Sequence, residues 1–430
     1  MAHKSSCSCV ICNRSCNAFL AALDRSPTFA MSLGAKELFH TNMLAFILED
    51  NTPTLDKVRD QIRGVLGIPW HPGESHSCLV WREAGSQHCR LDLVVMPLSA
   101  STPPSVLSNR ALVVEAKLKS IPTVAQLGAI SAALPSVSVT LRGGFTAVGP
   151  SRSFVLPSTT LCCLLSDVLP PSLSSPWSSA NWTQVHTAIS SGLSAPLYPP
   201  VLPALLSDYA NSLNSLTTIL GCISAWVKPN VIWGEVVDCV TDAEFKDRRL
   251  HDLVGKYAFS LVLNGAIAPT VVTLIVPAPV AGFPWSVDSF VGYSSRGRTP
   301  LLHYGFKICN PTTKKAVSLG VQIEGDSFRH YVSCHPGNVI GLSSLVGPLW
   351  PWLITGLSGL VRAGTMSPTV PVPASLNSYK SAGETFMYAK RSVSADTVSK
   401  VSNDVLSSLS NLSTAITSSH LVQHAISSLL

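Results

Sequence analysis

The pattern of apolar and polar positions predicts two short buried strands in the first third of the chain. Leu91–Met96 and Ala111–Val114 are runs rich in Val and Leu, and each is bounded by turn-forming residues. The first run contains Asp92, and the second is followed by Glu115 and Lys117. Side chains two residues apart on a strand point to the same face, so the last two share a side. Burying a carboxylate and an ammonium there costs free energy unless they bind a partner, and the usual partner is a hard divalent cation.

Apolar residues at helical spacing predict helices before and after these strands. Upstream, a helix that begins at Ala35 carries Glu37 in its first turn, and a second helix covers Leu55–Leu66. Downstream, a helix that begins near Pro122 carries Gln126. A first-turn carboxylate is also favoured by the helix dipole alone, and a surface position would explain the glutamine equally well. A functional role for Glu37 and Gln126 is therefore expected only because the strand residues Asp92, Glu115 and Lys117 accompany them.

The five polar residues resemble the signature of a known family. In order along the chain they are Glu37, Asp92, Glu115, Lys117 and Gln126, and together they resemble the core motif of the PD-(D/E)XK nuclease superfamily. The segment WREAGSQHCRLDLVV looks like the strand pair of that group, with Glu83 ending the first strand, where it would support the lysine or simply cap the strand. FKDRRLHDLVGKY and GVQIEGDSFRHY are similar to downstream blocks of an uncharacterised bacterial and phage branch. The resemblance spans roughly residues 35–390 and is strongest over 35–127.

This resemblance implies a fold and a chemistry. The expected fold is mixed α/β (α+β), a restriction-endonuclease-like core with a mixed central sheet flanked by helices, and the expected activity is metal-dependent hydrolysis of phosphodiester bonds in nucleic acid, chiefly DNA. Asp92, Glu115 and Glu37 would hold Mg²⁺, for which Mn²⁺ could substitute. Lys117 would orient or deprotonate the attacking water, and Gln126 would steady the site. A nuclease-like fold that binds nucleic acid or protein without cutting it is the alternative, because charged residues are sparse.

Composition and turn residues divide the chain into five expected regions. They are a flexible cysteine-containing leader (1–34), the nuclease-like core (35–165), a Ser/Pro-rich connection with helices (166–258), a β-rich accessory region (259–390) and an amphipathic C-terminal helix (391–430). Two long apolar runs, 261–280 and 338–361, raise the question of membrane spans. Prolines interrupt both, so we expect buried strands and ordinary core, with no membrane partner.

Charge adds little to this picture. The 430 residues carry a formal net charge of +6, which suits a phosphate-containing partner without implying one. The most charged stretch, TDAEFKDRRLHDLVGKY, is expected to be helical and offers four basic side chains to a phosphodiester backbone: Lys246, Arg248, Arg249 and Lys256. Acidic residues interleave with them, so a self-paired solvated face is the favoured reading. Self-association into a homo-oligomer is left open.

Other metal-ligating residue types occur without a convincing pattern. Four cysteines crowd the N-terminus and could in principle hold zinc, although their spacing is too tight and no second pair follows: Cys7, Cys9, Cys12 and Cys16. Three histidines and a glutamate between the helices and strands are expected to face solvent: His71, Glu74, His76 and His88. Nothing at the N-terminus resembles a signal peptide, so a reducing cytoplasm is the expected location.

Overall fold

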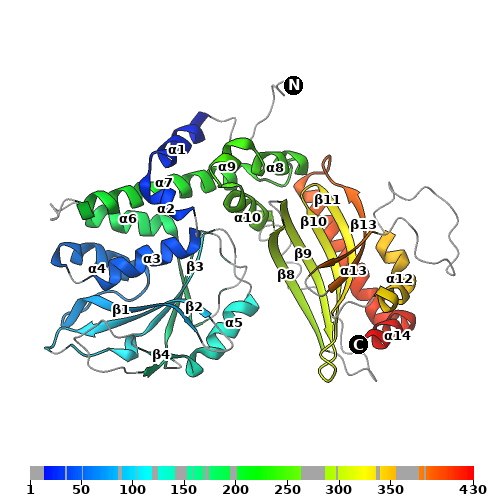
Figure 1. Cartoon of the computed structure of the whole chain (residues 1–430), viewed down its shortest axis with the longest axis horizontal. Coiled ribbons are helices and arrows are strands. Elements are labelled where there is room, and N and C mark those ends of the chain that lie inside the picture. The colour runs from blue at the N-terminus through cyan, green and yellow to red at the C-terminus, as the bar shows by residue number, and fades with distance from the viewer. Residues whose placement is uncertain are drawn as a thin grey trace. The chain divides into compact units, whose positions relative to one another are not determined.

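The computed structural model divides the chain into two units, one formed by Val10–Ile223 and the other beginning at Ser224 and running to Leu430. Each unit has its own sheet and its own helices (Figure 1). The residues described are 14–33, 36–50, 52–85, 90–102, 104–118, 124–140, 153–157, 159–167, 169, 173, 175–193, 201–262, 286–296, 299–335, 339–354, 377–381 and 384–430.

The first unit is built on a mixed five-stranded sheet of order β1-β2-β3-β6-β7. The strands are β1 (Glu74–Gly85), β2 (Arg90–Ser99), β3 (Leu112–Lys117), β6 (Leu161–Ser166) and β7 (Trp177–Ala180). β1, β2 and β3 pair antiparallel, whereas β3, β6 and β7 run parallel. The two predicted strands are therefore confirmed as neighbours, β2 and β3, at the centre of the sheet. A separate two-stranded ribbon joins β4 (Ser138–Thr140) and β5 (Ser153–Val155).

Helices cover both faces of this sheet. α5 (Val124–Ala133) packs its Leu127 and Ile130 against strand residues such as Val113. Strand side chains alternate between faces, and α3 (Lys36–Glu49) packs against the other face of β1, β2 and β3. α4 (Asp56–Val65) lies beside α3 on that side (Figure 1) and packs against α6 (Trp182–Gly192).

A buried polar cluster ties the N-terminal helices to the rest of this unit. In place of the flexible leader expected over 1–34, residues 14–32 form α1 (Arg14–Asp24) and α2 (Pro27–Ser32). Thr28 donates from its backbone N–H (2.9 Å) and its hydroxyl (2.7 Å) to Asp208 Oδ2, on α7 (Val201–Trp226). These hydrogen bonds explain why the segment is ordered. Cys7, Cys9 and Cys12 lie outside the described residues, and Cys16 lies in α1.

The second unit contains an antiparallel six-stranded sheet of order β12-β13-β11-β10-β9-β8. Its strands are β8 (Ser286–Arg296), β9 (Thr299–Cys309), β10 (Ala316–Glu324), β11 (Ser327–His335), β12 (Asn377–Ser381) and β13 (Glu384–Ser392). All neighbouring pairs are antiparallel. Three further helices precede the sheet in the chain: α8 (Trp233–Val240), α9 (Ala243–Asp247) and α10 (His251–Val262).

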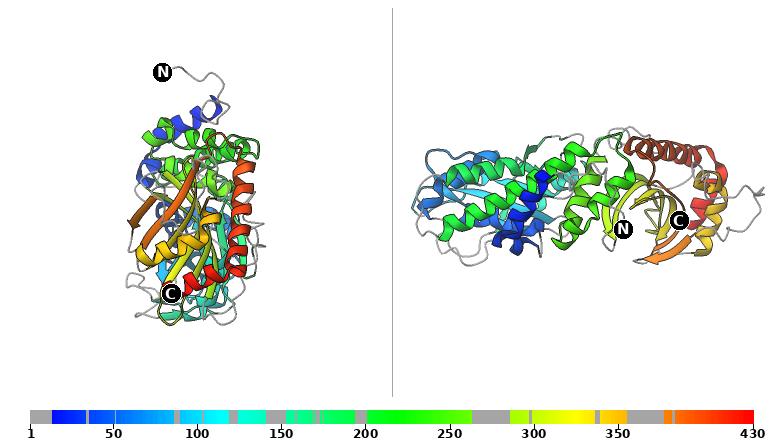
Figure 2. Two further views of the ribbon diagram at one scale, coloured as in Figure 1. Left: turned by 90° about the vertical axis from the view of Figure 1, so that its right-hand side faces the viewer. Right: turned by 90° about the horizontal axis from the view of Figure 1, so that it is seen from above.

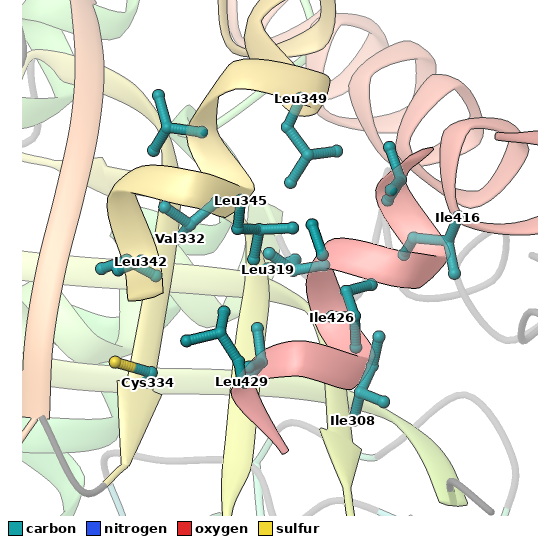
Figure 3. Packing of buried hydrophobic residues seen from close by; sticks show 14 of the residues in the cluster. Ile308, Leu319, Val332, Cys334, Leu342, Leu345, Leu349, Ile416, Ile426 and Leu429 are labelled. Carbon is teal, nitrogen blue, oxygen red and sulfur yellow. The ribbon is translucent and has the colours of Figure 1, made fainter. Parts of the chain in front are cut away.

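One face of the second sheet packs against the C-terminal helices. α12 (Val339–Ile354), α13 (Val398–Ser418) and α14 (His420–Leu429) lie along the same side of the sheet (Figures 1 and 2). Their apolar side chains interlock with those of the strands in one buried cluster (Figure 3), which includes Leu319, Leu345 and Ile426. None of the described helices is both long and apolar enough to cross a membrane.

Several boundaries differ from the sequence expectation, each for a local reason. The connection expected from residue 166 also contributes a strand, β7, which pairs with β6 and buries Trp177 and Ala180 at its two ends, whereas α6 falls within the helical part expected of this region. The charged helix expected over 241–257 is split into α9 and α10 at Arg249, whose φ of 55° is left-handed. The single C-terminal helix is two helices separated at Ser419, which caps α14. Of the run 261–280, which was expected to hold two buried strands, Leu261 and Val262 form the end of α10, and the rest lies outside the described part of the chain. Contrary to expectation, Pro348 and Pro351 lie within α12.

Candidate active site

Asp92 and Glu115 lie side by side on neighbouring strands at the centre of the first sheet. The pairing of Leu93 with Val114 sets this register, so Asp92 falls opposite Glu115 and on the same face. Asp92 Oδ2 accepts a hydrogen bond of 2.9 Å from the backbone N–H of Ala116. That bond fixes one carboxylate oxygen against the backbone that carries the other carboxylate.

Lys117 connects these two carboxylates. Its Nζ lies 2.7 Å from Glu115 Oε1 and 3.4 Å from Asp92 Oδ2. The same-face placement predicted for Glu115 and Lys117 is therefore what the structure has. Two anionic side chains therefore share this cationic group.

Gln126 closes the site from the helix that follows β3. It lies in the first turn of α5, and its Nε2 donates to Glu115 Oε1 at 3.2 Å. Burial is graded across the cluster: side-chain exposure is 3% for Glu115, 15% for Lys117 and 28% for Asp92. The cluster is therefore deepest at Glu115 and opens to solvent on the side of Asp92.

Glu37 is the fifth residue of the predicted set. It lies in the first turn of α3, as expected, and α3 packs against β2 and β3. Its side chain lies outside the part of the structure that is described, so its place in the site stays a prediction.

The end of β6 contributes residues that the sequence reading did not single out. Ser166 pairs with Lys117 in the parallel register and is buried, so it lies on the same face beside the lysine. Asp167 follows directly, and burial raises the pKa of its carboxyl to about 6, against a smaller lowering by the Trp182 backbone N–H that donates to it at 3.1 Å. The sequence signal for these two residues was a Ser-Asp pair at the end of an apolar strand. Parallel strands end at the same edge of a sheet, so such a pair is expected near the end of β3.

The donor set fits a hard divalent cation. Asp92 and Glu115 both reach one cationic group, the ammonium of Lys117, so a single cation can be shared by both carboxylates. Oxygen ligands of this kind suit Mg²⁺, which keeps several waters and needs only one or two carboxylates. Among the described residues, no group of three or more His, Cys, Asp or Glu side chains is arranged to hold a metal ion. A two-carboxylate Mg²⁺ site does not require such a group.

The other polar residues considered from the sequence lie apart from this cluster. Glu74 does not face solvent: it is buried between Arg63 and Arg110. Burial raises the pKa of its carboxyl, but the hydrogen bonds from the two guanidinium groups outweigh that effect and lower it. Glu83 forms an ion pair with Arg90.

The three histidines near β1 have different surroundings. The His76 ring stacks on Trp70 and its Nδ1 lies 2.9 Å from Asp60 Oδ1. These contacts give the half-buried ring a structural partner. His71 lies in the loop before β1 and is exposed, whereas His88 lies outside the described residues.

The basic residues proposed for nucleic-acid contact lie in the second unit. Arg248 forms an ion pair with Glu244 at 2.5 Å, and Lys256 forms one with Asp252 at 3.5 Å. Both pairs join residues four apart in the sequence. Lys246 lies in α9, and Arg249 follows it before α10. These ion pairs agree with the expectation that the basic and acidic side chains of this segment pair with one another.

Comparison with known proteins adds no relative. The chain matches no protein-family model, no curated protein and no solved structure. What can be said about its function therefore rests on the residues and their geometry.

Proposed function

We propose that the cluster of Asp92, Glu115, Lys117 and Gln126 is the active site of a Mg²⁺-dependent nuclease that hydrolyses phosphodiester bonds, with DNA as the preferred substrate. The observation that carries this proposal is the position of Lys117 Nζ between the two carboxylates on one face of the sheet. Residues from two strands and a helix would not converge in this way around a charged group without a use for it, because each buried charge costs free energy.

Asp92 and Glu115 would hold the cation, with the backbone carbonyl of Ala116 as a further oxygen ligand nearby. When bound, Mg²⁺ supplies Lewis-acid stabilisation of the phosphate charge and makes water more acidic. The hydrogen bond from Gln126 to Glu115 would keep that carboxylate oriented. Asp92, the most exposed of the three charged groups, would face the incoming phosphate and its cation.

Lys117 would act on the reacting atoms. A cation bound by the carboxylates would compete with its ammonium for them, which would release Nζ toward the substrate. There it would orient the attacking water or accept its proton, and offset negative charge that develops on the phosphate. Its side chain is mostly buried beside Glu115.

The test is cleavage of plasmid and short oligonucleotides by the purified full chain in Mg²⁺ or Mn²⁺. We expect EDTA to stop cleavage and Glu115→Gln, which keeps the side-chain shape, to reduce it by about 100-fold or more. Asp24→Asn is the matched control, because Asp24 is an exposed carboxylate on α1 of the same unit. Cleavage by Glu115→Gln at the rate of the parent would refute the site.

A different outcome would favour the alternative function. If the parent does not cut under any metal condition but binds oligonucleotides with an affinity that falls as salt rises, the chain is a binding module on a nuclease-like frame. Calorimetric titration with Mn²⁺ separates the two cases further, because the nuclease reading requires metal binding that Glu115→Gln weakens.

A further inference from the structure

Two tryptophans at the ends of one short segment contact the elements that carry the site. Trp177 opens β7 and Trp182 opens α6, and both side chains are buried. Each donates its indole N–H to a backbone carbonyl in a different site element, one in β3 and one in α5. The segment was expected to be a surface connection, so neither residue was singled out from the sequence.

Trp182 holds the end of β3. Its Nε1 donates to the backbone carbonyl of Lys117 at 3.0 Å, across 65 residues of sequence. Its own backbone N–H donates to Asp167, at the end of the neighbouring strand β6, and its ring packs on His40 with centroids 5.4 Å apart. Asn181 and Gln184 form a capping box at the start of α6. The indole thus contacts both His40 and the strand residue that carries the ammonium, while the backbone of Trp182 is held by Asp167.

Trp177 holds the start of α5. Its Nε1 donates to Ser131 Oγ at 2.9 Å and to the backbone carbonyl of Leu127 at 3.3 Å. Leu127 directly follows Gln126, the residue that donates to Glu115. The second indole therefore contacts the helical turn that presents the site glutamine.

We propose that Trp177 and Trp182 are positioning residues that set the distance between the end of β3 and the first turn of α5. This inference rests on the proposed function. A buried indole needs a hydrogen-bond acceptor, but core packing alone does not require both acceptors to lie on site elements. Catalytic groups must be held within about 0.5 Å of their productive geometry by the groups around them, and these two hydrogen bonds restrain both sides of the contact between Gln126 and Glu115.

The test replaces each donor without removing the ring. Trp182→Phe and Trp177→Phe lose only the N–H donor and part of the ring, and replacement of either indole by benzothienylalanine keeps the full ring size if the Phe variants fold poorly. Trp233→Phe is the matched control, because Trp233 is fully buried and donates to a backbone carbonyl, that of Gly325, at 2.8 Å in the other unit. For each variant, kcat and KM on an oligonucleotide, Mn²⁺ affinity by calorimetry and amide hydrogen exchange are measured.

We expect a local and specific loss. In Trp182→Phe, exchange should accelerate in peptides covering Leu112–Lys117, and in Trp177→Phe, it should accelerate in those covering Val124–Ala133. In both variants kcat should fall about tenfold while KM stays within about twofold, since misplaced groups slow the reaction more than they weaken binding. The Trp233→Phe control should change exchange only within residues 224–430 and leave kcat unaltered.

Two results would overturn the inference. One is wild-type kcat in both variants despite faster exchange, which would make the two bonds structural only. The other is unchanged exchange in β3 and α5. If the parent protein does not cut, the proposed function fails. The inference is then tested by Mn²⁺ affinity, and unaltered affinity in both Trp variants would overturn it as well.

Discussion

Lys117 Nζ lies 2.7 Å from Glu115 Oε1, on the same face of the same strand. The two charges are separated by one residue, Ala116, whose own backbone N–H donates to Asp92. Three consecutive residues of β3 thus supply an anion, a backbone donor and a cation to one cluster. The expected outcomes of four changes follow from this site and from the packing within each unit.

Removal of the ammonium should abolish most of the activity. Lys117→Met keeps the length of the aliphatic chain but leaves the carboxylates of Asp92 and Glu115 without their shared cation. We expect the rate of oligonucleotide cleavage in saturating Mg²⁺ to fall by about 100-fold or more, the usual range for loss of a general acid or base. Lys57→Met, at an exposed position on α4, is the control and should cut like the parent. A Lys117→Met protein with full activity would exclude the lysine from the chemistry.

A buried histidine should make the second unit sensitive to acid. His330 on β11 is fully buried, its Nδ1 lies 3.0 Å from the Leu353 carbonyl and its Nε2 lies 2.9 Å from Ser408 Oγ. Burial lowers its pKa to about 4. Between about pH 4 and 6.5 the unfolded chain binds more protons at this residue than the folded chain, so its contribution to stability is present above pH 6.5 and is lost as pH falls toward 4.

The size of this effect follows from the shift, at about 1.4 kcal/mol per pKa unit, and amounts to about 3 kcal/mol. It is measured as the difference in unfolding free energy between the parent and His330→Gln at several pH values. The destabilisation caused by the substitution should shrink as pH falls from 6.5 to 4. A difference that does not vary with pH would show that His330 titrates normally.

Close packing between α4 and α6 should make Gly192 intolerant of a side chain. A Cβ at this position would lie 2.6 Å from Val58 Cγ2 and 2.7 Å from Val58 Cα. We expect Gly192→Ala to lower the free energy of unfolding by about 1–3 kcal/mol, as overpacked cores do. Gly221→Ala is the comparison, because nothing lies within 4 Å of its Cβ in α7, and there alanine should be neutral or stabilising by up to about 1 kcal/mol. Equal effects of the two substitutions in chemical denaturation would contradict the close contact.

The helix-covered face of the second sheet should depend on Leu345. This side chain of α12 is fully buried among strand residues such as Leu319 (Figure 3). Leu345→Ala should cost about 2–5 kcal/mol of unfolding free energy through lost burial and the cavity that remains. Leu421→Ala, in α14, removes the same atoms from a side chain that is 70% exposed and should change stability by less than about 0.5 kcal/mol. A Leu345 variant as stable as the Leu421 variant would show that this core is not closely packed.

Local patterns in the sequence were sufficient for most of the individual elements. Runs of Val and Leu identified β2 and β3, and helical periodicity identified α3, α4 and α5, because burial imposes a period of two or of about 3.6 residues on the chain itself. Glu115 and Lys117 could be placed on one face by the same rule. The split of the charged stretch at Arg249 was not predictable in this way, because a left-handed backbone angle at an arginine leaves no compositional signal.

What the chain determined by itself, then, was that Glu115 and Lys117 share one face of a buried strand, since strand alternation is a local property. Only the tertiary structure decided which distant residues surround them. The parallel pairing of β3 with β6 brings Ser166 beside Lys117, and the indole of Trp182 reaches the Lys117 carbonyl from a different element. Such contacts depend on strand order and helix placement, which are set by burial of the whole core and not by any pattern within one segment.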